Sequence, residues 1–340
     1  MVSRPAALPR FVRYSLLDLA AIGPGEQAGD ALHGAVPLAL AAEASGYHRV
    51  WYAEHHNMPA IASAATSVVI ANVAAHTEHI RLGSGGIMLP NHSPLVIAEQ
   101  FGTLAALHPG RIDLGLGRAP GSDQNTMRAL RRTPSSADSF PQDIVELQGY
   151  LSGNSQIKGV RAIPGEGTNV PLYILGSSLF GAQLAAALGL PYAFASHFAP
   201  SALFPAIQTY RVEYRPSEQN PEPYLIVAAN LIADEEEDVA RAQQQSALRW
   251  RARRFLTNAR DLSDEEIDAV LDSPSGYQIK DMMRYTAVGT PEQAQSYLAQ
   301  LAEKTGADEL ILNAGAPERA ARLRAVQLVK APAEVGSPAN

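Results

Sequence analysis

The chain has 340 residues, 46% of them hydrophobic, which is enough for one large barrel or two ordinary domains around a sizeable core. Its formal net charge of −7 argues against a nucleic acid or an anionic membrane as partner, because both select basic surfaces. The absence of cysteine excludes disulfides, thiolate metal sites and a cysteine nucleophile. No apolar run resembles a signal peptide or is long enough to span a bilayer, so we expect a cytoplasmic protein.

Short apolar segments alternate with helical patterns along the whole chain. The predicted strands, each bounded by turn residues, cover 11–17, 48–53, 80–85, 111–116, 171–175, 192–195, 224–232 and 309–312. The predicted helices cover 30–45, 63–76, 93–107, 138–152, 178–188, 200–213, 235–255 and 317–329. This alternation predicts a (β/α)8 TIM barrel in a single domain at 1–330, with an insertion before the last strand and a disordered tail at 331–340. A doubly wound sheet is the alternative.

Two segments are additional to the eight strand–helix units of a minimal barrel. Residues 153–170 are rich in Gly and polar residues, which indicates a surface excursion. Residues 256–306 include the acidic stretch 262–273 and a helix with a capped start at Thr290-Pro291-Glu292. An insertion of this size near strand ends is compatible with a mobile lid and, equally, with an extra packed helical hairpin.

Two neighbouring helices carry almost no charge. The stretch 57–77 has no charged residue, and Glu99 is the one charged residue of 94–107. The outer face of a barrel helix is normally charged, so we expect these faces to be covered in a homodimer built on helices 63–76 and 93–107. An exposed helix rich in Ala and Ser is the alternative.

The second predicted strand runs into Glu54-His55-His56-Asn57, at the face of a barrel that carries function. Successive side chains on a strand point to opposite sides, so His55 and His56 are not expected to serve one centre. A metal site needs three or four convergent ligands, and the histidine spacing offers no such set. One histidine here suits a general acid or base, and a structural hydrogen bond is an equally good explanation.

Glycines and an arginine follow the third and fourth strands. Gly85-Gly86 ends a buried strand, which indicates either a bulge or the close approach of a flat ligand. Arg118 follows Gly117 and is suited to a phosphate oxygen. The glycines at 115, 117 and 121 do not have the spacing of a dinucleotide-binding motif, and we reject that interpretation.

The fifth strand runs into Gly176-Ser177-Ser178, where a helix begins. Free amides and the positive end of a helix dipole form an anion site, and small residues such as Gly181 and Ala182 let a phosphate approach. Either serine could instead be no more than an N-cap.

Four stretches together carry a family resemblance: AEHHN, GSGGIMLPNHSP, HPGRIDLGLGRAPGSD and LGSSLFGAQLAAALGLPYAFASHFAP. Over about residues 11–329 the chain resembles the bacterial luciferase-like flavin monooxygenases. The resemblance implies a (β/α)8 barrel that binds FMN or the deazaflavin F420, and a non-prolyl cis peptide at Gly85-Gly86 that supports the flavin ring. It implies His55 as catalytic residue with Glu54 as its acidic neighbour, and phosphate contacts from Arg118 and from Ser177, Ser178, Gly181 and Ala182.

The implied function is oxygenation of a small organic substrate with O2 and reduced FMN. Gly117 stands where luciferase has a reactive cysteine, so light emission is not implied. The chain has no pyridine-nucleotide motif, so reduced flavin is expected from a separate flavin reductase. The alternatives are hydride transfer with F420, a non-catalytic flavin-binding protein and a metal hydrolase.

Overall fold

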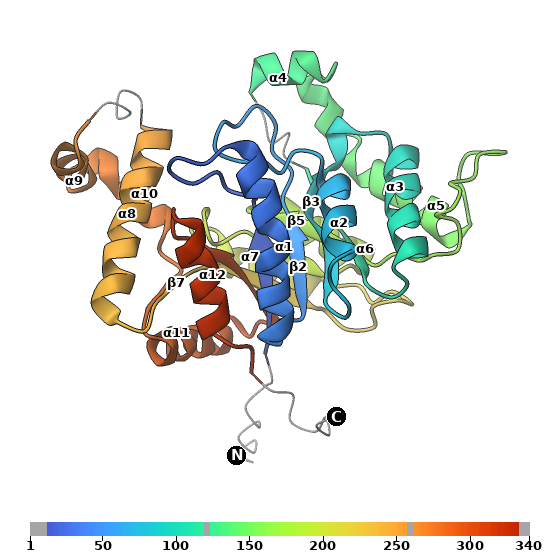
Figure 1. Cartoon of the computed structure of the whole chain (residues 1–340). Helices are drawn as coiled ribbons and strands as arrows, with labels where there is room; N and C mark the ends of the chain where they lie inside the picture. Colours follow the sequence, from blue (N-terminus) through green and yellow to red (C-terminus); the bar gives the residue numbers. More distant parts are fainter. Residues whose placement is uncertain (1–11, 119–122, 257–261, 333–340) are drawn as a thin grey trace.

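A closed ring of parallel strands forms the centre of the computed structural model, which describes residues 12–118, 123–256 and 262–332 (Figure 1). The ring contains β1 (Arg13–Asp18), β2 (Arg49–Tyr52), β3 (Arg81–Met88), β4 (Ile112–Gly117), β5 (Leu172–Gly176), β6 (Tyr192–Phe194), β7 (Leu225–Ala233) and β9 (Glu309–Ala314). Consecutive members are paired, and β9 pairs with both β7 and β1, which closes the ring. The predicted TIM barrel is confirmed.

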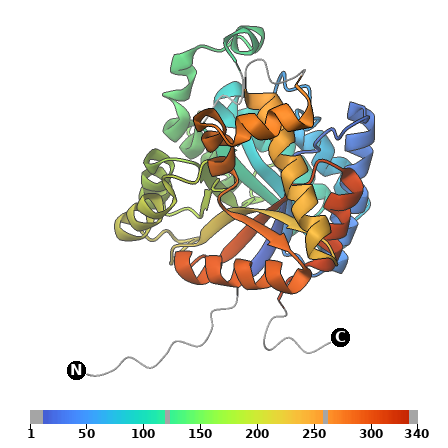
Figure 2. The same ribbon diagram turned by 90° about the vertical axis from the view of Figure 1, so that its left-hand side faces the viewer.

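Helices surround this ring in both views (Figures 1 and 2). They are α1 (Ala28–Ala44), α2 (Thr66–Ala74), α3 (Pro94–Leu107), α5 (Phe140–Ser152), α6 (Leu179–Leu188), α7 (Leu203–Glu213), α8 (Glu237–Phe255) and α12 (Arg319–Leu328). Each corresponds to a predicted helix. The main core lies between strands and helices, because side chains such as Val50, Leu82 and Leu114 point outward from the ring. No helix in the described ranges is long and apolar enough to cross a membrane.

Several short elements were not predicted. The strand β8 (Thr286–Gly289) pairs with the second half of β7, next to the positions where the first half of β7 pairs with β6. Four residues are too few for a readable pattern. The helix α4 (Gln124–Ala129) is capped by Asp123, and two 3-10 turns are η1 (Leu89–Asn91) and η2 (Pro134–Ala137). The helix α11 (Pro291–Thr305) begins at Thr290 with a capping box, as predicted.

The insertion expected at 256–306, before the last ring strand, contains a packed pair of helices, followed by β8 and α11. The helices α9 (Asp264–Leu271) and α10 (Pro274–Met282) lie against α8, around Ile267, Leu271 and Ile279 (Figure 1). This arrangement matches the hairpin alternative. Residues 257–261 lie outside the described ranges, as do residues 333–340 of the tail expected to be disordered.

The segment 153–170 has no helix or strand, and part of it packs on α3. A Cβ atom on Gly102 of α3 would lie 2.1 Å from the Cα atom of Gly165. The segment is therefore more than a surface excursion, because its backbone fills a gap that no side chain could share.

A buried ion cluster fills the end of the barrel at which the strands begin. Arg49 of β2 lies with Nη1 2.7 Å from Asp113 Oδ2 of β4 and with Nε 3.0 Å from Glu309 Oε1 of β9. The Nη1 atom also donates to the hydroxyl of Tyr173, and Tyr224 donates to Glu309. Burial alone would raise the pKa of Asp113, but the charges of Arg49 and Arg81 outweigh it and hold that pKa below its usual value.

Replacing Asp113 with Asn is expected to lower the free energy of unfolding by about 3–5 kcal/mol, because it leaves buried positive charge without its partner. Because the pKa of Asp113 is lower in the folded protein, its carboxylate contributes fully to the free energy of unfolding above the unfolded pKa of about 3.9. This contribution is lost as the pH falls through the lower pKa of the folded state. Denaturant unfolding at neutral pH measures the effect. The control is Asp272→Asn, an exposed residue paired with Lys280. An equal effect of both substitutions would contradict a structural role for the cluster.

Candidate active site

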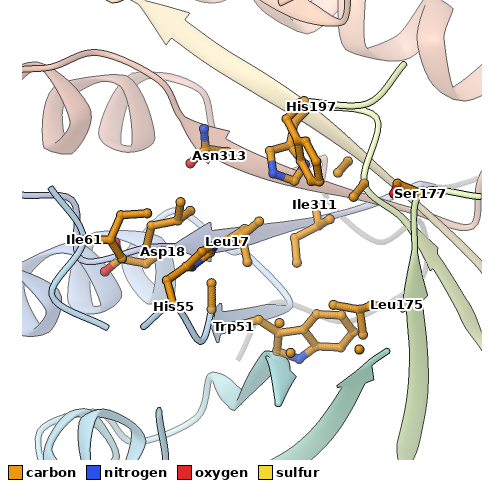
Figure 3. Close-up of a pocket in the computed structure, with 18 of the residues that line it drawn as sticks. Leu17, Asp18, Trp51, His55, Ile61, Leu175, Ser177, His197, Ile311 and Asn313 are labelled. Carbon is orange, nitrogen blue, oxygen red and sulfur yellow. The ribbon is translucent and has the colours of Figure 1, made fainter. Parts of the chain in front are cut away.

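A cavity of about 740 Å³ opens at the ends of the strands, above the ion cluster. Its floor includes Leu17, Trp51 and Ile311, whose side chains point inside the ring (Figure 3). The indole Nε1 of Trp51 lies 3.4 Å from Asp113 Oδ2, and its ring packs edge-on against Tyr173. The floor therefore rests directly on the ion cluster. In a (β/α)8 barrel this is the face at which ligands bind.

Gly85 and Gly86 form a bare stretch of the cavity wall. The peptide bond between them is cis, and the pairing of β3 with β4 shifts between Ser84 and Ile87. A Cβ atom on Gly85 would lie 2.8 Å from Leu17 Cδ1, and one on Gly86 would lie 2.8 Å from the carbonyl oxygen of Gly115. Neither position has room for a side chain, so this wall presents backbone alone to the cavity.

His55 lines the cavity, and its Nδ1 atom is buried with no hydrogen-bond partner. Burial lowers the pKa of this imidazole, and the positive charge of Arg254 lowers it further, so the ring is neutral at neutral pH. A neutral imidazole in a cavity wall, with one nitrogen unpartnered, can accept a proton or a hydrogen bond from a ligand.

Glu54 is not among the residues that line the cavity, although it precedes His55. Its Oε1 atom lies 2.7 Å from His56 Nε2 and 2.8 Å from His92 Nε2, and its Oε2 atom accepts a hydrogen bond from the amide of Met88. Burial would raise the pKa of Glu54, but these hydrogen bonds outweigh it and lower the pKa to about 2. The carboxylate therefore ties the end of β2 to the segment that follows β3.

Glu54, His56 and His92 are also the one group in the described ranges that could hold a metal ion. The histidine spacing alone did not reveal this group, because His92 comes from the segment after β3. Both imidazoles contact the same carboxylate oxygen at hydrogen-bond distance. These hydrogen bonds satisfy the carboxylate without a metal.

The loops after β4 and β5 form another part of the wall. Arg118 stacks over the ring of Phe180 at 4.3 Å and donates from Nε to the carbonyl oxygen of Ala137. Its Nη2 atom forms a long ion pair of 3.8 Å with the exposed Asp138, but the side chain is 42% exposed, so an anion can still reach its guanidinium. Residues 119–122 of the motif HPGRIDLGLGRAPGSD lie outside the described ranges.

Ser177, Ser178 and Gly181 line the same part of the cavity. Ser178 stands at the N-cap position of α6, but its side chain makes no capping hydrogen bond. The first amides of a helix lack partners within the helix, so the start of α6 can bind an anion. Ala182, predicted with this group, lies fully buried in the core and does not line the cavity.

Sequence reasoning missed a set of cavity residues from later elements. They are His197 after β6, Asn313 of β9, and Trp250, Arg251 and Arg254 of α8. Figure 3 shows His197 and Asn313 across the cavity from His55 and Trp51. Burial, with Arg251 nearby, lowers the pKa of His197 to about 3. The sequence signal was the run RWRARRF at 249–255, which concentrates Arg and aromatic residues near the end of a helix.

Four of the buried polar atoms that have no partner among the described residues belong to side chains that line this cavity. They are Nδ1 of His55, Nδ1 of His197, Nε1 of Trp250 and Nη1 of Arg251. Buried polar groups are nearly always hydrogen-bonded in folded proteins. Their concentration here indicates a site built for a polar ligand with a large flat or apolar body.

Comparison with known proteins gives one consistent family. The sequence model described as "Luciferase-like monooxygenase" matches residues 12–309. A luciferase-like monooxygenase of Escherichia coli K12 is 47% identical over 324 residues, which cover 94% of this chain and 96% of the relative. The N-acetyl-S-alkylcysteine monooxygenase of Bacillus subtilis is 41% identical over 190 residues, covering 54% of this chain and 57% of the relative.

Solved structures share the fold. The crystal structure of apo-MsnO8 has a TM-score of 0.84 and 32% identity and covers 94% of this chain and 97% of that chain. The oxygenating constituent of 3,6-diketocamphane monooxygenase from Pseudomonas putida, in complex with FMN, has a TM-score of 0.69 at 17% identity, with coverage of 94% and 96%. An F420-dependent secondary alcohol dehydrogenase has the same TM-score and identity, with coverage of 94% and 98%.

The matched motifs lie in the loops that line the cavity, and the family match covers most of the chain. The chain belongs to the luciferase-like monooxygenase family.

Proposed function

We propose that the protein is an FMN-dependent monooxygenase that uses reduced flavin and O2 to oxygenate a small organic substrate. The observation that carries the proposal is that one cavity is lined both by the bare Gly85-Gly86 backbone and by His55, whose Nδ1 atom has no hydrogen-bond partner. A planar ring can lie against backbone without side chains, and a neutral imidazole beside it can hold or accept a proton. The residues present fit a flavin.

We assign the phosphate of FMN to Arg118 and to the start of α6, at Ser177, Ser178 and Gly181. A guanidinium and a helix N-terminus are complementary to a phosphate dianion. Ala182 contributes only through its small size, since its side chain lies in the core.

We assign His55 as the catalytic residue, which holds or moves a proton at Nδ1, next to the substrate. Glu54 is then a positioning residue, because it acts through the hydrogen bonds that fix the segments on either side of the site. Reduced FMN, when bound, supplies the electrons that activate O2, while the chain binds, orients and excludes water. A separate flavin reductase is the proposed source of reduced FMN.

F420-dependent hydride transfer is the second candidate. It is favoured by the fold shared with the F420-dependent secondary alcohol dehydrogenase. The two functions differ in the cofactor bound and in whether O2 is consumed.

We also propose a homodimer formed through α2 and α3. Neither helix carries a charged residue apart from Glu99, yet Val68 is 66% exposed and Leu107 is 66% exposed. Apolar side chains on adjacent helices that lack charge form a surface suited to a two-fold interface.

Replacing Arg118 with Gln is expected to weaken FMN binding roughly 10- to 100-fold, because a charge-assisted hydrogen bond to the phosphate is lost. Riboflavin has no phosphate, so its dissociation constant should not change. Fluorescence titration with both flavins measures this difference, with Arg161→Gln, an exposed arginine elsewhere, as control. Equal weakening for both flavins, or none for either, would contradict the assignment.

Replacing His55 with Ala is expected to leave the dissociation constant of FMN within about twofold and to reduce product formation by roughly 10²–10⁴, the contribution of a general acid or base. Product is measured on a compound selected by screening wild-type protein with reduced FMN and O2. The control is His79→Ala, whose side chain is 85% exposed. Equal losses of binding and turnover would show that His55 does not have the proposed role.

Replacing Val68 with Glu is expected to convert a dimer into a monomer, because a charge would be buried in the proposed interface. Sedimentation velocity measures the mass, and circular dichroism checks the fold. Val212→Glu on α7 is the control, since Val212 is 77% exposed on a helix outside the proposed interface. A variant at Val68 that remains dimeric would exclude the α2–α3 interface.

A further inference from the structure

Two arginines of α8 line the cavity with no ion-pair partner in the part of the chain that the structure describes. Arg251 and Arg254 both line it, and their spacing of three residues puts them on one face of the helix. Other arginines of α8 are paired: Arg249 with Asp264 and Asp268, Arg253 with Asp264, and Arg241 with Glu237. Within the described ranges, neither Arg251 nor Arg254 forms an ion pair. The two arginines of α8 that line the cavity thus differ from Arg241, Arg249 and Arg253 of the same helix, which are all paired.

Arg251 is held in place but not neutralised. Its Nη2 atom donates to Oδ1 of Asn230 at 3.2 Å, and Nη1 is buried with no partner. Asn230 is itself fixed, because it donates to the carbonyl oxygen of His197 and accepts from Asn313. The amide orients the guanidinium while its charge and one donor edge remain free. A guanidinium offers donors in a planar fork that matches a carboxylate.

Arg254 stands next to the ring of Trp250, with Cζ 5.3 Å from the ring centroid. Burial lowers the pKa of Arg251 to about 10, with a further contribution from the positive charge of Arg254. Arg254 also lowers the pKa of His55, so Arg254 lies close to the proposed catalytic histidine, and Arg251 likewise lowers the pKa of His197. Two neighbouring cations in a partly buried wall are costly unless an anion joins them.

We propose that Arg251 and Arg254 bind the carboxylate of the organic substrate and so orient its apolar body beside His55. This inference rests on the proposed function and adds the substrate class: a small carboxylic acid with an aliphatic or aromatic body. Trp250, Phe198 and Met58 supply apolar surface for that body in the same cavity.

The FMN phosphate is the other possible anion, and the location of the pair disfavours it. Arg251 contacts Asn230 on β7, whereas Arg118 and the start of α6 follow β4 and β5. The phosphate groups proposed above thus occupy a different sector of the ring.

Isothermal titration of the FMN-saturated protein with phenylacetate and with phenylacetamide tests the inference. The two probes share a body and differ in charge. Wild-type protein is expected to bind phenylacetate at least about tenfold more tightly, as a charge-assisted hydrogen bond requires. Arg251→Gln and Arg254→Gln should each remove most of this preference and leave the affinity for phenylacetamide within about twofold.

Two controls and the independent Arg254 variant separate the possible results. Arg241→Gln changes an exposed, paired arginine of the same helix and should keep the preference. Among the described residues the guanidinium of Arg254 makes no hydrogen bond, so its variant tests the inference even if the Arg251 variant disturbs Asn230. The dissociation constant of FMN should stay unchanged in both cavity variants.

Two outcomes would overturn the inference. One is a wild-type protein that binds FMN but does not distinguish the probes. The other is a loss of FMN affinity in Arg251→Gln as large as that in Arg118→Gln, which would assign the pair to the phosphate. Failure to bind FMN at all would instead contradict the proposed function, and the same titration on the flavin-free protein would still test the arginines.

Discussion

The ion pairs of Arg49 with Asp113 and Glu309 fill the end of the barrel where β2, β4 and β9 begin. A ring of eight strands has an interior just wide enough for side chains, so whatever occupies one end decides what space is left at the other. Here charged groups occupy the first layer, Trp51 and Tyr173 the next, and the third is left open as a cavity. Buried charges of this kind persist only when each is paired, and these are.

The strand β2 links the buried ion cluster to the candidate active site. Alternation along the chain points Arg49, Trp51 and His55 into the ring. Arg49 belongs to the ion cluster, Trp51 to the cavity floor and His55 to the cavity wall. Val50 and Tyr52 point outward into the main core. Glu54 follows them on that side and forms hydrogen bonds with His56, His92 and the amide of Met88. The cluster at the bottom therefore supports the position of His55 through a continuous, fully packed strand. The bare glycine wall of β3 lies directly beside it.

Most of the architecture could be predicted because it depends on local signals. Apolar strands with turn residues at their ends gave the ring, and the glycine pair and the strand-end loops marked the cavity wall. The strand β8 was missed because Thr286–Gly289 is too short for a pattern and depends on its pairing with β7. Ala182 lies in the core because the first turn of α6 packs inward there, which spacing from Ser178 alone does not reveal.

The missed cavity residues have a different cause. His197, Arg251 and Arg254 come from the end of β6 and from α8, and only the folded chain brings them near His55. Among the described residues Arg251 and Arg254 have no acidic partner, and this is a property of tertiary structure, since the same helix carries arginines that are paired. The Glu54–His56–His92 group likewise joins two segments that are far apart in sequence.

The proposed function requires that this cavity bind reduced FMN and use it with O2. Parallel anaerobic titrations of the purified protein with reduced FMN and with reduced F420, each followed by oxygen-electrode measurements after air is admitted, test it most directly. We expect saturable binding of reduced FMN with a lower dissociation constant than that of F420, and O2 consumption by the FMN complex. Tighter binding of F420, without O2 consumption, would contradict it and favour hydride transfer.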